Sequence, residues 1–350
     1  MNFAKQIANL GTETAFAVSA QARIWADKGN KVYPFHLGDI NLKTPPNIVE
    51  AMIKAVGDGK TGYCPSEGIL PLREALAHDV GQRRNVVYSP ENVAVQPGGK
   101  PTIGKFIAAV MNPGDEVLYP NPGYPIYESQ IEYQRGRAVP YSYIETENGF
   151  DIDIEKLKAS ITNKTVAIIY NNYQNPISAE SSKEEMEQVA DIAISNDLWV
   201  LSDEAYFEMI YEGKARSIVE IPNMKERTVI LYTFSKKFAM TGWRVGASIG
   251  PEKIIKIISK LNINAESCTT HFIQGAMVEA LTGDMSGSKE ILSKLKNRRD
   301  VAVSGLNAIE GIDISKPRCT FYLFPNVTSI MRKKGFSTID QLQIGALENA

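Results

Sequence analysis

Two neighbouring lysines, Lys236 and Lys237, are the residues of this sequence with the clearest chemical potential. They lie in the stretch SKKFAMTGWRVG (235–246), where an apolar run, TVILYTF (228–234), has just ended. A lysine amine whose pKa is lowered by its surroundings forms a Schiff base with a carbonyl compound, and pyridoxal phosphate is the commonest carbonyl partner. Most lysine pairs are solvated charges, so this chemistry requires the other parts of a cofactor site.

Those other parts have defined chemical requirements. The pyridine nitrogen of pyridoxal phosphate needs a carboxylate, its phenolic oxygen needs hydrogen-bond donors, and its ring face needs an aromatic cover. Its phosphate needs backbone amides at a helix N-terminus, together with hydroxyls and an arginine. With Lys236 as the covalent anchor, the sequence offers Asp203 for the nitrogen, Tyr206 and Asn175 for the phenolic oxygen, Tyr124 for the ring face, and Gly99, Lys100, Thr233 and Arg244 for the phosphate.

These candidates share a position in the sequence, because they lie at or just beyond the ends of apolar runs rich in Val, Ile and Leu. Such runs that do not alternate with polar residues are typical of strands covered on both faces, and helical patterns between them predict a mainly parallel α/β sheet. Ligands bind beyond the carboxyl ends of the strands in such sheets. The runs occupy residues 92–96, 115–120, 165–172, 198–206, 228–234 and 245–250, with a helical pattern at 182–196.

The two ends of the chain differ from this central part. Residues 287–308 have a helical pattern, and CTFYLFPNV (319–327) is a candidate strand. We therefore expect a large α/β domain at residues 46–260 and a smaller domain built from residues 1–45 and 261–350.

Composition excludes several classes of protein. The chain has 350 residues, 43% of them hydrophobic and 22% charged, with a net charge of −2, so it offers no basic surface for nucleic acid or an anionic membrane. Three cysteines without CxxC spacing and three scattered histidines predict reduced thiols and no metal site. An N-terminus typical of an amphipathic helix, with no stretch of roughly 20 apolar residues, predicts a cytoplasmic protein. Nucleotide-binding P-loop, HExxH and GxSxG motifs are absent from the sequence.

The motifs together resemble those of a known family. TFSKKFAMTGWRVG contains Lys236, Asp203 of DEAY lies 33 residues before it, and Asn175 of YQNP lies 28 residues before Asp203. In order and spacing, from about Ile24 to Pro325, the chain resembles the class I/II aminotransferases of the fold-type I pyridoxal-phosphate family, which are aspartate aminotransferase-like. The resemblance implies a mainly parallel seven-stranded sheet with helices on both faces and a smaller α+β domain.

The resemblance also implies roles for particular residues. Lys236 becomes the Schiff-base residue, with Asp203 and Tyr206 as its catalytic partners, while Lys237 is interpreted as a bystander charge at the surface. Gly38 in HLGDI is expected to lie against the substrate carboxylate, together with Asn175. Tyr63 in KTGYCPS is expected to reach the phosphate of a neighbouring subunit, which implies a homodimer with shared active sites.

Two departures from the family pattern stand out. Where the family usually has Asn-Pro-Thr-Gly, this chain has Asn175 to Ser178 with the sequence NPIS, so the turn loses a glycine and its backbone is expected to differ. The family also carries a later arginine that binds the substrate carboxylate. No matching arginine occurs here, because Arg332 precedes the expected region and lies in a Lys/Arg cluster interpreted as surface. We expect the sequence, which stops at Ala350, to be a truncated form of a longer chain; the alternative is that this protein binds carboxylates differently.

The function that we infer is transfer of an amino group from an L-amino acid to a 2-oxo acid by ping-pong chemistry through a Lys236 aldimine. Two alternatives stay open at this point. One is another pyridoxal-phosphate reaction of the C–S or C–C lyase or synthase type, because the fold alone does not determine the reaction. The other is a pyridoxal-phosphate-binding protein with little turnover. The sequence does not specify which amino acid or oxo acid would be the substrate.

Overall fold

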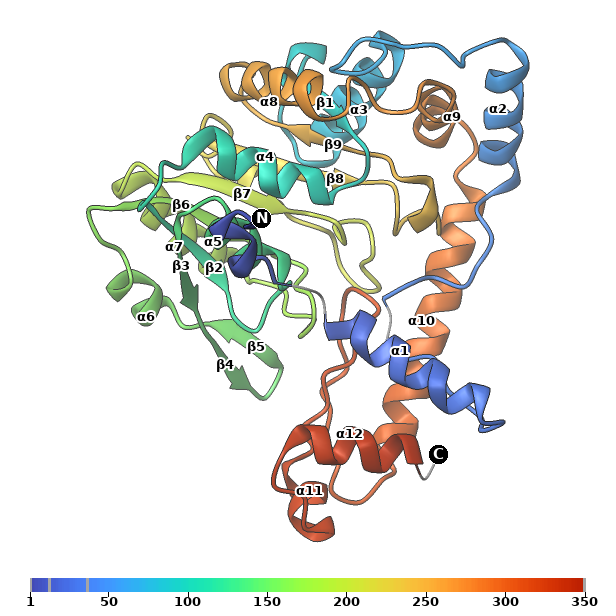
Figure 1. Ribbon diagram of the computed structural model, residues 1–350, viewed down its shortest axis with the longest axis vertical. Coiled ribbons are helices and arrows are strands. Elements are labelled where there is room, and N and C mark those ends of the chain that lie inside the picture. The colour runs from blue at the N-terminus through green and yellow to red at the C-terminus, as the bar shows by residue number, and fades with distance from the viewer. Residues whose placement is uncertain (1, 12–13, 36–37, 349–350) are drawn as a thin grey trace.

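The computed structural model describes residues 2–11, 14–35 and 38–348, and a central seven-stranded sheet organises the chain (Figure 1). The order of its strands is β1-β9-β8-β7-β6-β2-β3. These strands are β1 (Val93–Gln96), β2 (Glu116–Pro120), β3 (Arg137–Tyr141), β6 (Thr165–Tyr170), β7 (Trp199–Asp203), β8 (Thr228–Thr233) and β9 (Gly246–Ile249). A separate hairpin consists of β4 (Tyr143–Thr146) and β5 (Gly149–Ile152).

The sheet is mainly parallel, as the apolar runs predicted. Strands β3, β2, β6, β7 and β8 pair in parallel, whereas β9 is antiparallel to both β8 and β1. The six predicted runs contain β1, β2, β6, β7, β8 and β9. The sequence analysis missed β3, because this edge strand is only partly buried and Pro140 interrupts its apolar pattern.

Helices cover both faces of the sheet, which confirms the predicted layers. On one face, α4 (Lys100–Val110), α5 (Ile126–Tyr133) and α8 (Glu252–Ala265) pack with residues such as Val229 and Leu231 of β8. On the other face, Ile230 and Tyr232 pack with α2 (Pro46–Gly57), α3 (Leu70–Arg83) and α9 (His271–Thr282). Further along this second face lie α6 (Ile154–Ala159) and α7 (Lys183–Ser195). The alternation along β8 therefore separates two apolar cores.

The remaining helices lie below the sheet in the view of Figure 1, around the long helix α10 (Ser286–Asn307). They are α1 (Thr14–Asp27), α11 (Thr328–Lys334) and α12 (Ile339–Glu348). Elsewhere in the described chain, short 3₁₀ helices form at η1 (Lys5–Asn9), η2 (Pro90–Asn92), η3 (Ile218–Glu220) and η4 (Thr241–Trp243). Ile291 and Leu295 of α10 pack against the segment that follows β7. This contact brings the C-terminal part of the chain to the carboxyl edge of the sheet.

The strand expected at 319–327 is wrong. Cys319 and Asn326 each form an isolated bridge, with Ile210 and Asp313 respectively, and no continuous strand joins them. Thr320 has a φ of 58°, in the left-handed region, so the extended backbone breaks directly after the first bridge.

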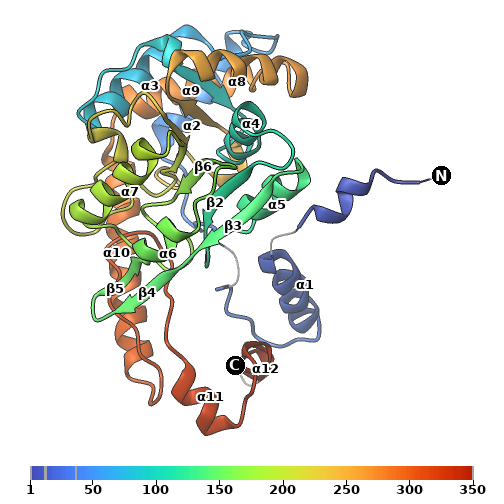
Figure 2. The same ribbon diagram turned by 90° about the vertical axis from the view of Figure 1, so that its left-hand side faces the viewer.

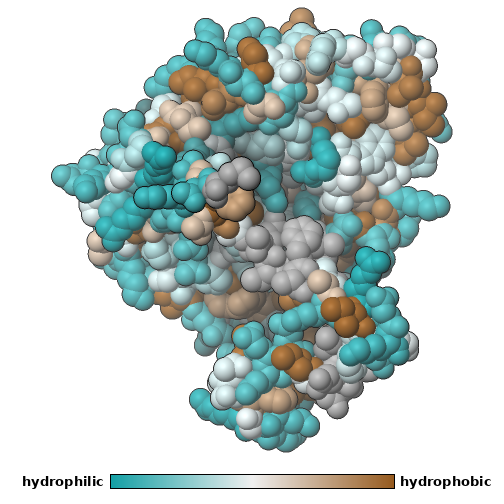
Figure 3. All heavy atoms as spheres, viewed as in Figure 1, coloured by the Kyte–Doolittle hydropathy of each residue, from teal (hydrophilic) through white to brown (hydrophobic). Residues whose placement is uncertain are grey.

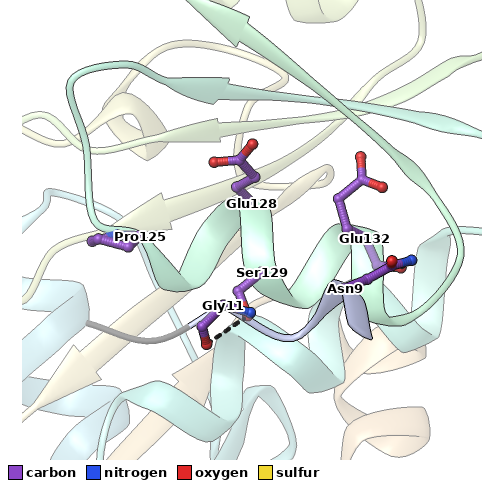
Figure 4. Close-up of a pocket in the computed structure, with 6 residues that line it drawn as sticks. All are labelled: Asn9, Gly11, Pro125, Glu128, Ser129 and Glu132. Atoms are coloured by element: carbon purple, nitrogen blue, oxygen red, sulfur yellow. Dashed lines mark hydrogen bonds between the residues drawn. The ribbon is translucent and has the colours of Figure 1, made fainter. Parts of the chain in front are cut away.

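The N-terminal segment lies beside α5 (Figure 2). The Gly11 amide donates to Oγ of Ser129 at 3.0 Å, and a shallow pocket forms where the two segments meet (Figure 4), lined by Asn9, Gly11, Pro125, Glu128, Ser129 and Glu132. This pocket does not contain any of the residues that the sequence predicts for the active site.

The described residues contain neither a helix suited to cross a membrane nor a cluster of metal-binding side chains. None of the helices that they form has both the length and the apolar character to cross a membrane. The same part of the chain contains no group of three or more His, Cys, Asp or Glu side chains that could hold a metal ion.

Candidate active site

Lys236 lies in the turn that follows β8, where its side chain is half-buried. Its Nζ donates to the carbonyl oxygen of Gly38 at 2.8 Å and lies 5.2 Å from the ring centre of Phe321 and 5.9 Å from that of Tyr206. The amine therefore meets three segments that are far apart in the sequence. Gly38, Tyr206 and Lys236, which were predicted to share a site, do lie together.

Lys237 is not a solvated surface charge, and that expectation is wrong. Its side chain is only 10% exposed, and Nζ contacts Oε1 of Glu208 at 2.8 Å. Arg83 binds the same carboxylate oxygen at 3.0 Å. Because a lysine this deeply placed requires a partner, Lys237 is a structural charge that ties the turn after β8 to the segment after β7.

Asp203 is the last residue of β7, and its carboxylate is almost completely buried. Tyr127 donates its phenol proton to Oδ2 at 2.6 Å, and the Ala205 amide donates to Oδ1 at 3.1 Å. Burial raises the pKa of Asp203 above its ordinary value, while these two hydrogen bonds act in the opposite direction. The carboxylate thus stands at the edge of the sheet with both oxygens bonded.

Asn175 and Tyr206 are held beside Asp203 by their neighbours. Oδ1 of Asn171 accepts a hydrogen bond from the backbone amide of Asn175 at 3.0 Å. Nδ2 of Asn171 donates to the backbone carbonyl of Asp203 at 2.8 Å. The Tyr206 hydroxyl lies 2.6 Å from that of Tyr322. Burial raises the pKa of Tyr206 well above its ordinary value, so this phenol is neutral at physiological pH and can donate.

The turn that starts at Asn175 places a serine where the family pattern has glycine. Ser178 has a φ of 55°, in the left-handed region that favours glycine. Its hydroxyl lies 2.6 Å from that of Thr320 and donates to the Tyr322 carbonyl at 2.9 Å. These contacts stabilise the left-handed serine and join the turn to the segment that carries Tyr322.

The glycines after β1 let the loop backbone pass close to the side chains of Arg244, Leu231 and Thr233. A Cβ atom on Gly98, whose φ is +101°, would lie 2.1 Å from Nη2 of Arg244, and one on Gly99 would lie 2.8 Å from Leu231 and 3.3 Å from Cβ of Thr233. Gly99 is the N-cap of α4, which begins at Lys100. The predicted phosphate residues Gly99, Lys100, Thr233 and Arg244 thus lie around one helix N-terminus.

Arg244 and Thr233 contact the loop itself. Arg244 is exposed in the left-handed conformation and donates through Nη1 to the Thr241 carbonyl at 2.7 Å. Thr233 donates to Oγ of Ser235 at 2.9 Å. Both side chains therefore stand at the rim, where an anion could reach them.

Tyr124 lies near both Tyr127, which binds Asp203, and Lys100, at the N-terminus of α4. Its ring meets Tyr127 edge-on, with 5.7 Å between the ring centres, and Nζ of Lys100 lies 5.7 Å from the Tyr124 ring centre. The residue predicted to cover the cofactor ring is thus adjacent to the tyrosine that binds Asp203.

Of the remaining predicted residues, Gly38 lies in the site, while Tyr63 and Arg332 are exposed. A Cβ on Gly38 would lie 2.8 Å from the Tyr322 hydroxyl, so this glycine allows the close approach of the tyrosine. Tyr63 is 88% exposed, so none of the other predicted residues covers its side chain. Arg332, expected at the surface, is exposed on α11.

Sequence reasoning missed Tyr127, Asn171 and Tyr322. Tyr322 lies in FYLFPN, and Asn171 lies at the end of a predicted strand, so their positions offered a signal. Tyr127 had a weaker one, since it lies three residues after Tyr124 and would share a helix face with it only if one helix contained both residues, whereas α5 begins at Ile126.

Comparison with known proteins extends these observations. A model of the family described as aminotransferase class I and II matches residues 31–342. The chain is 34% identical to a probable aspartate/prephenate aminotransferase of Aquifex aeolicus, over 95% of this chain and 85% of that one. It is 35% identical to an aspartate aminotransferase of Sulfolobus acidocaldarius, over 97% and 85%. Among solved structures, aspartate aminotransferase from Thermus thermophilus with maleate has a TM-score of 0.89 at 30% identity, covering 94% of this chain and 86% of that one.

Proposed function

Because the chain belongs to the class I and II aminotransferases, we propose that this transferase uses pyridoxal 5'-phosphate and takes its amino group from an acidic L-amino acid such as aspartate. Relatives that are named aspartate aminotransferase support this donor. The observation that carries the proposal is the arrangement of Lys236, Asp203 and Tyr206 at one edge of the sheet. An amine, a buried carboxylate and a phenol are the groups that this cofactor requires.

The described residues fit the cofactor. Gly98 and Gly99 let the backbone at the N-terminus of α4 lie directly against Arg244 and Thr233, and a side chain at either position would collide with Arg244 or Leu231. An apolar residue could fill the place of the buried Asp203 carboxylate without the free-energy cost of burying a charge, so packing alone does not explain this aspartate. A ring nitrogen that carries a proton would give it a charge partner.

The proposed roles of the protein groups follow from their places. Bound pyridoxal phosphate would supply an electron sink for the electrons released when the substrate Cα–H bond breaks. Lys236 would carry the proton to and from the substrate Cα through its Nζ. Asp203 would hold a proton on the ring nitrogen, while Tyr206 and Asn175 would orient the phenolic oxygen.

The phosphate and substrate would be held by the outer residues. The amides of Gly99 and Lys100, the Thr233 hydroxyl and the Arg244 guanidinium would bind the phosphate. Tyr124 would cover the ring. On the open side, Gly38 would lie against the substrate carboxylate together with Asn175.

We propose a homodimer in which Tyr63 reaches the phosphate of the neighbouring subunit. The exposure of this side chain supports it, since a large aromatic residue that is 88% exposed on a monomer is suited to an interface. Apolar residues on α2 are also exposed, among them Ile53 at 62% and Val56 at 43%. Figure 3 shows hydrophobic atoms at the right-hand edge of the molecule, where α2 lies.

Location and domain organisation are also proposals. Free thiols at Cys64, Cys268 and Cys319 support a cytoplasmic location. We propose a large domain centred on residues 46–260 and a smaller one from the two ends of the chain. Packing of α9 against α2 and α3 favours placing the later boundary after Thr282.

The test uses purified protein reconstituted with pyridoxal phosphate. Aspartate should convert the bound cofactor to its amine form and release one equivalent of oxo acid, and 2-oxoglutarate should restore the original absorbance. With an amino acid that carries a leaving group at Cβ, such as cysteine, release of pyruvate, ammonia and that leaving group (sulfide) without an oxo-acid acceptor would favour an elimination instead. If the cofactor binds and no amino acid of a full panel converts it, transamination by this protein is wrong.

A further inference from the structure

We propose that Tyr127 is a positioning residue of the reaction, which holds the Asp203 carboxylate ionised and in place for the cofactor ring. The inference rests on the proposed role of Asp203 and adds a residue on a different element. Tyr127 is the second residue of α5, and Asp203 ends β7, 76 residues later.

The contact has the geometry of a strong hydrogen bond. The Tyr127 oxygen lies 2.6 Å from Oδ2 of Asp203, and the Tyr127 side chain is fully buried. Phenol-to-carboxylate bonds of this length are charge-assisted and stronger than bonds between neutral groups. Burial and the neighbouring Asp203 charge both raise the pKa of Tyr127, so its proton stays on the phenol and Tyr127 is the donor.

The surroundings of Asp203 favour its protonated form, so the hydrogen bond from Tyr127 is important for keeping the carboxylate ionised. Burial favours the neutral acid, and the adjacent Glu204 raises the pKa of Asp203 further. Arg84 directs its charge to Glu204, at 2.5 Å, and Tyr206 faces Asp203 as a neutral phenol. The two described hydrogen bonds to the carboxylate oxygens come from a phenol and a backbone amide, so neutral donors oppose the effect of burial.

The position of Tyr127 is itself determined by the fold. Its ring belongs to the apolar core that also contains Phe106 and Ile131, and its backbone amide donates to the Tyr124 carbonyl at 3.1 Å. One turn of chain therefore carries both the residue proposed to cover the ring and the residue that holds the carboxylate behind it.

The experiment must separate this role from simple core packing. Tyr127→Phe removes only the hydroxyl, and Tyr141→Phe is its matched control, because Tyr141 is equally buried and donates to the Ile169 carbonyl at 3.0 Å. The apo proteins are labelled with ¹³C at the aspartate carboxyls, with Asp203→Asn used to assign the Asp203 signal. Titration by NMR then reports the pKa of Asp203 without any cofactor.

We expect Tyr127→Phe to raise the pKa of Asp203 by about one unit and to weaken binding of pyridoxal phosphate about tenfold or more, because a hydrogen bond to a charged group is lost. Tyr141→Phe should lower the melting temperature but leave both quantities at their wild-type values. In an Asp203→Asn background, Tyr127→Phe should cause no further loss of cofactor affinity.

Contrary results are distinguishable. An unchanged Asp203 titration in Tyr127→Phe, or equal shifts in both tyrosine variants, would overturn the inference. If wild-type protein binds no pyridoxal phosphate, the proposed function fails, while the apo titration still decides whether Tyr127 controls the ionisation of Asp203.

Discussion

The two halves of the candidate site are built in different ways. Around the position proposed for the cofactor ring, Asp203, Asn175 and Tyr206 are each bonded to a further protein side chain or amide, and two of these three are buried. Around the position proposed for the phosphate, Arg244 is exposed and its described hydrogen bond goes to a carbonyl of its own loop, while two glycines bring the backbone close to Arg244 and Thr233.

This difference indicates a division of labour. The ring half has its geometry before any ligand arrives, so its residues should influence the chemical step more than the folding of the site. The phosphate half combines the exposed Arg244 guanidinium with the backbone amides at the N-terminus of α4, so its residues should mainly determine affinity for the anion.

The largest expected effect concerns the anchor of the ring half. Lys236→Ala should lower kcat by about 10⁴-fold or more, since it removes both the covalent attachment and the proton carrier. Bound pyridoxal phosphate should also no longer be trapped on the protein by borohydride reduction. Steady-state kinetics and mass spectrometry of the reduced protein measure these two effects.

Lys237→Ala is the control for this change. It should retain borohydride trapping and activity within about tenfold, but lower the free energy of unfolding by roughly 1–3 kcal/mol, because Glu208 loses the more deeply buried of its two basic partners. If this variant lost activity as completely as Lys236→Ala, the assignment of the anchor would be wrong.

A smaller effect should come from the phosphate half. Arg244→Ala should weaken pyridoxal phosphate binding about 10- to 100-fold with little change in kcat at saturating cofactor, because a charge-assisted contact to the phosphate is removed. Arg244→Lys should recover part of the affinity but not its bidentate geometry. A fall in kcat at saturation as large as the fall in affinity would show that the two halves are not separable.

Asp203 should limit the stability of the apo protein. Its folded-state pKa is raised above the ordinary value of an aspartate, chiefly by burial, so the folded form binds a proton more tightly than the unfolded form. The stability that it contributes is complete below the unfolded pKa and is lost as the pH rises through the folded pKa. Asp203→Asn should thus be more stable than wild type at pH 8, on the order of 1 kcal/mol, with a difference that shrinks towards pH 4. Chemical denaturation of both apo proteins at several pH values measures it, and a pH-independent difference would contradict it.

The smallest effect is expected at the serine turn. Ser178→Gly removes the strain of a left-handed serine but also its hydrogen bonds to Thr320 and Tyr322, and these contributions are each about 1 kcal/mol with opposite sign. The free energy of unfolding should therefore change by less than about 1 kcal/mol. A large loss would mean that the link to Tyr322 supports more of the ring half than its two bonds suggest.

Much of the site could be predicted because its residues follow locally recognisable strands. Asp203, Thr233 and Lys236 lie at or just beyond the ends of buried strands, and such ends meet at one edge of a parallel sheet. Lys237 was misinterpreted because its burial depends on Glu208, which reaches it from another strand end. Tyr127 was missed because its contact with Asp203 depends on how α5 packs against the sheet, a relation that no local pattern encodes.

The pairing of Gln96 with Gly246 limits how this chain can change in length. The turn after β1, which carries Gly98 and Gly99, and the turn before β9, which carries Arg244, both join the sheet at this residue pair. Thr233 of β8 pairs with Gly246 on its other side. A single inserted or deleted residue in β1 or β9 would displace one turn by about 3.3 Å and reverse the faces of the side chains beyond it. The register of β1, β9 and β8 is therefore fixed together. An insertion or deletion here would separate the anion-binding groups, whereas the exposed β4–β5 turn can accept a change in length.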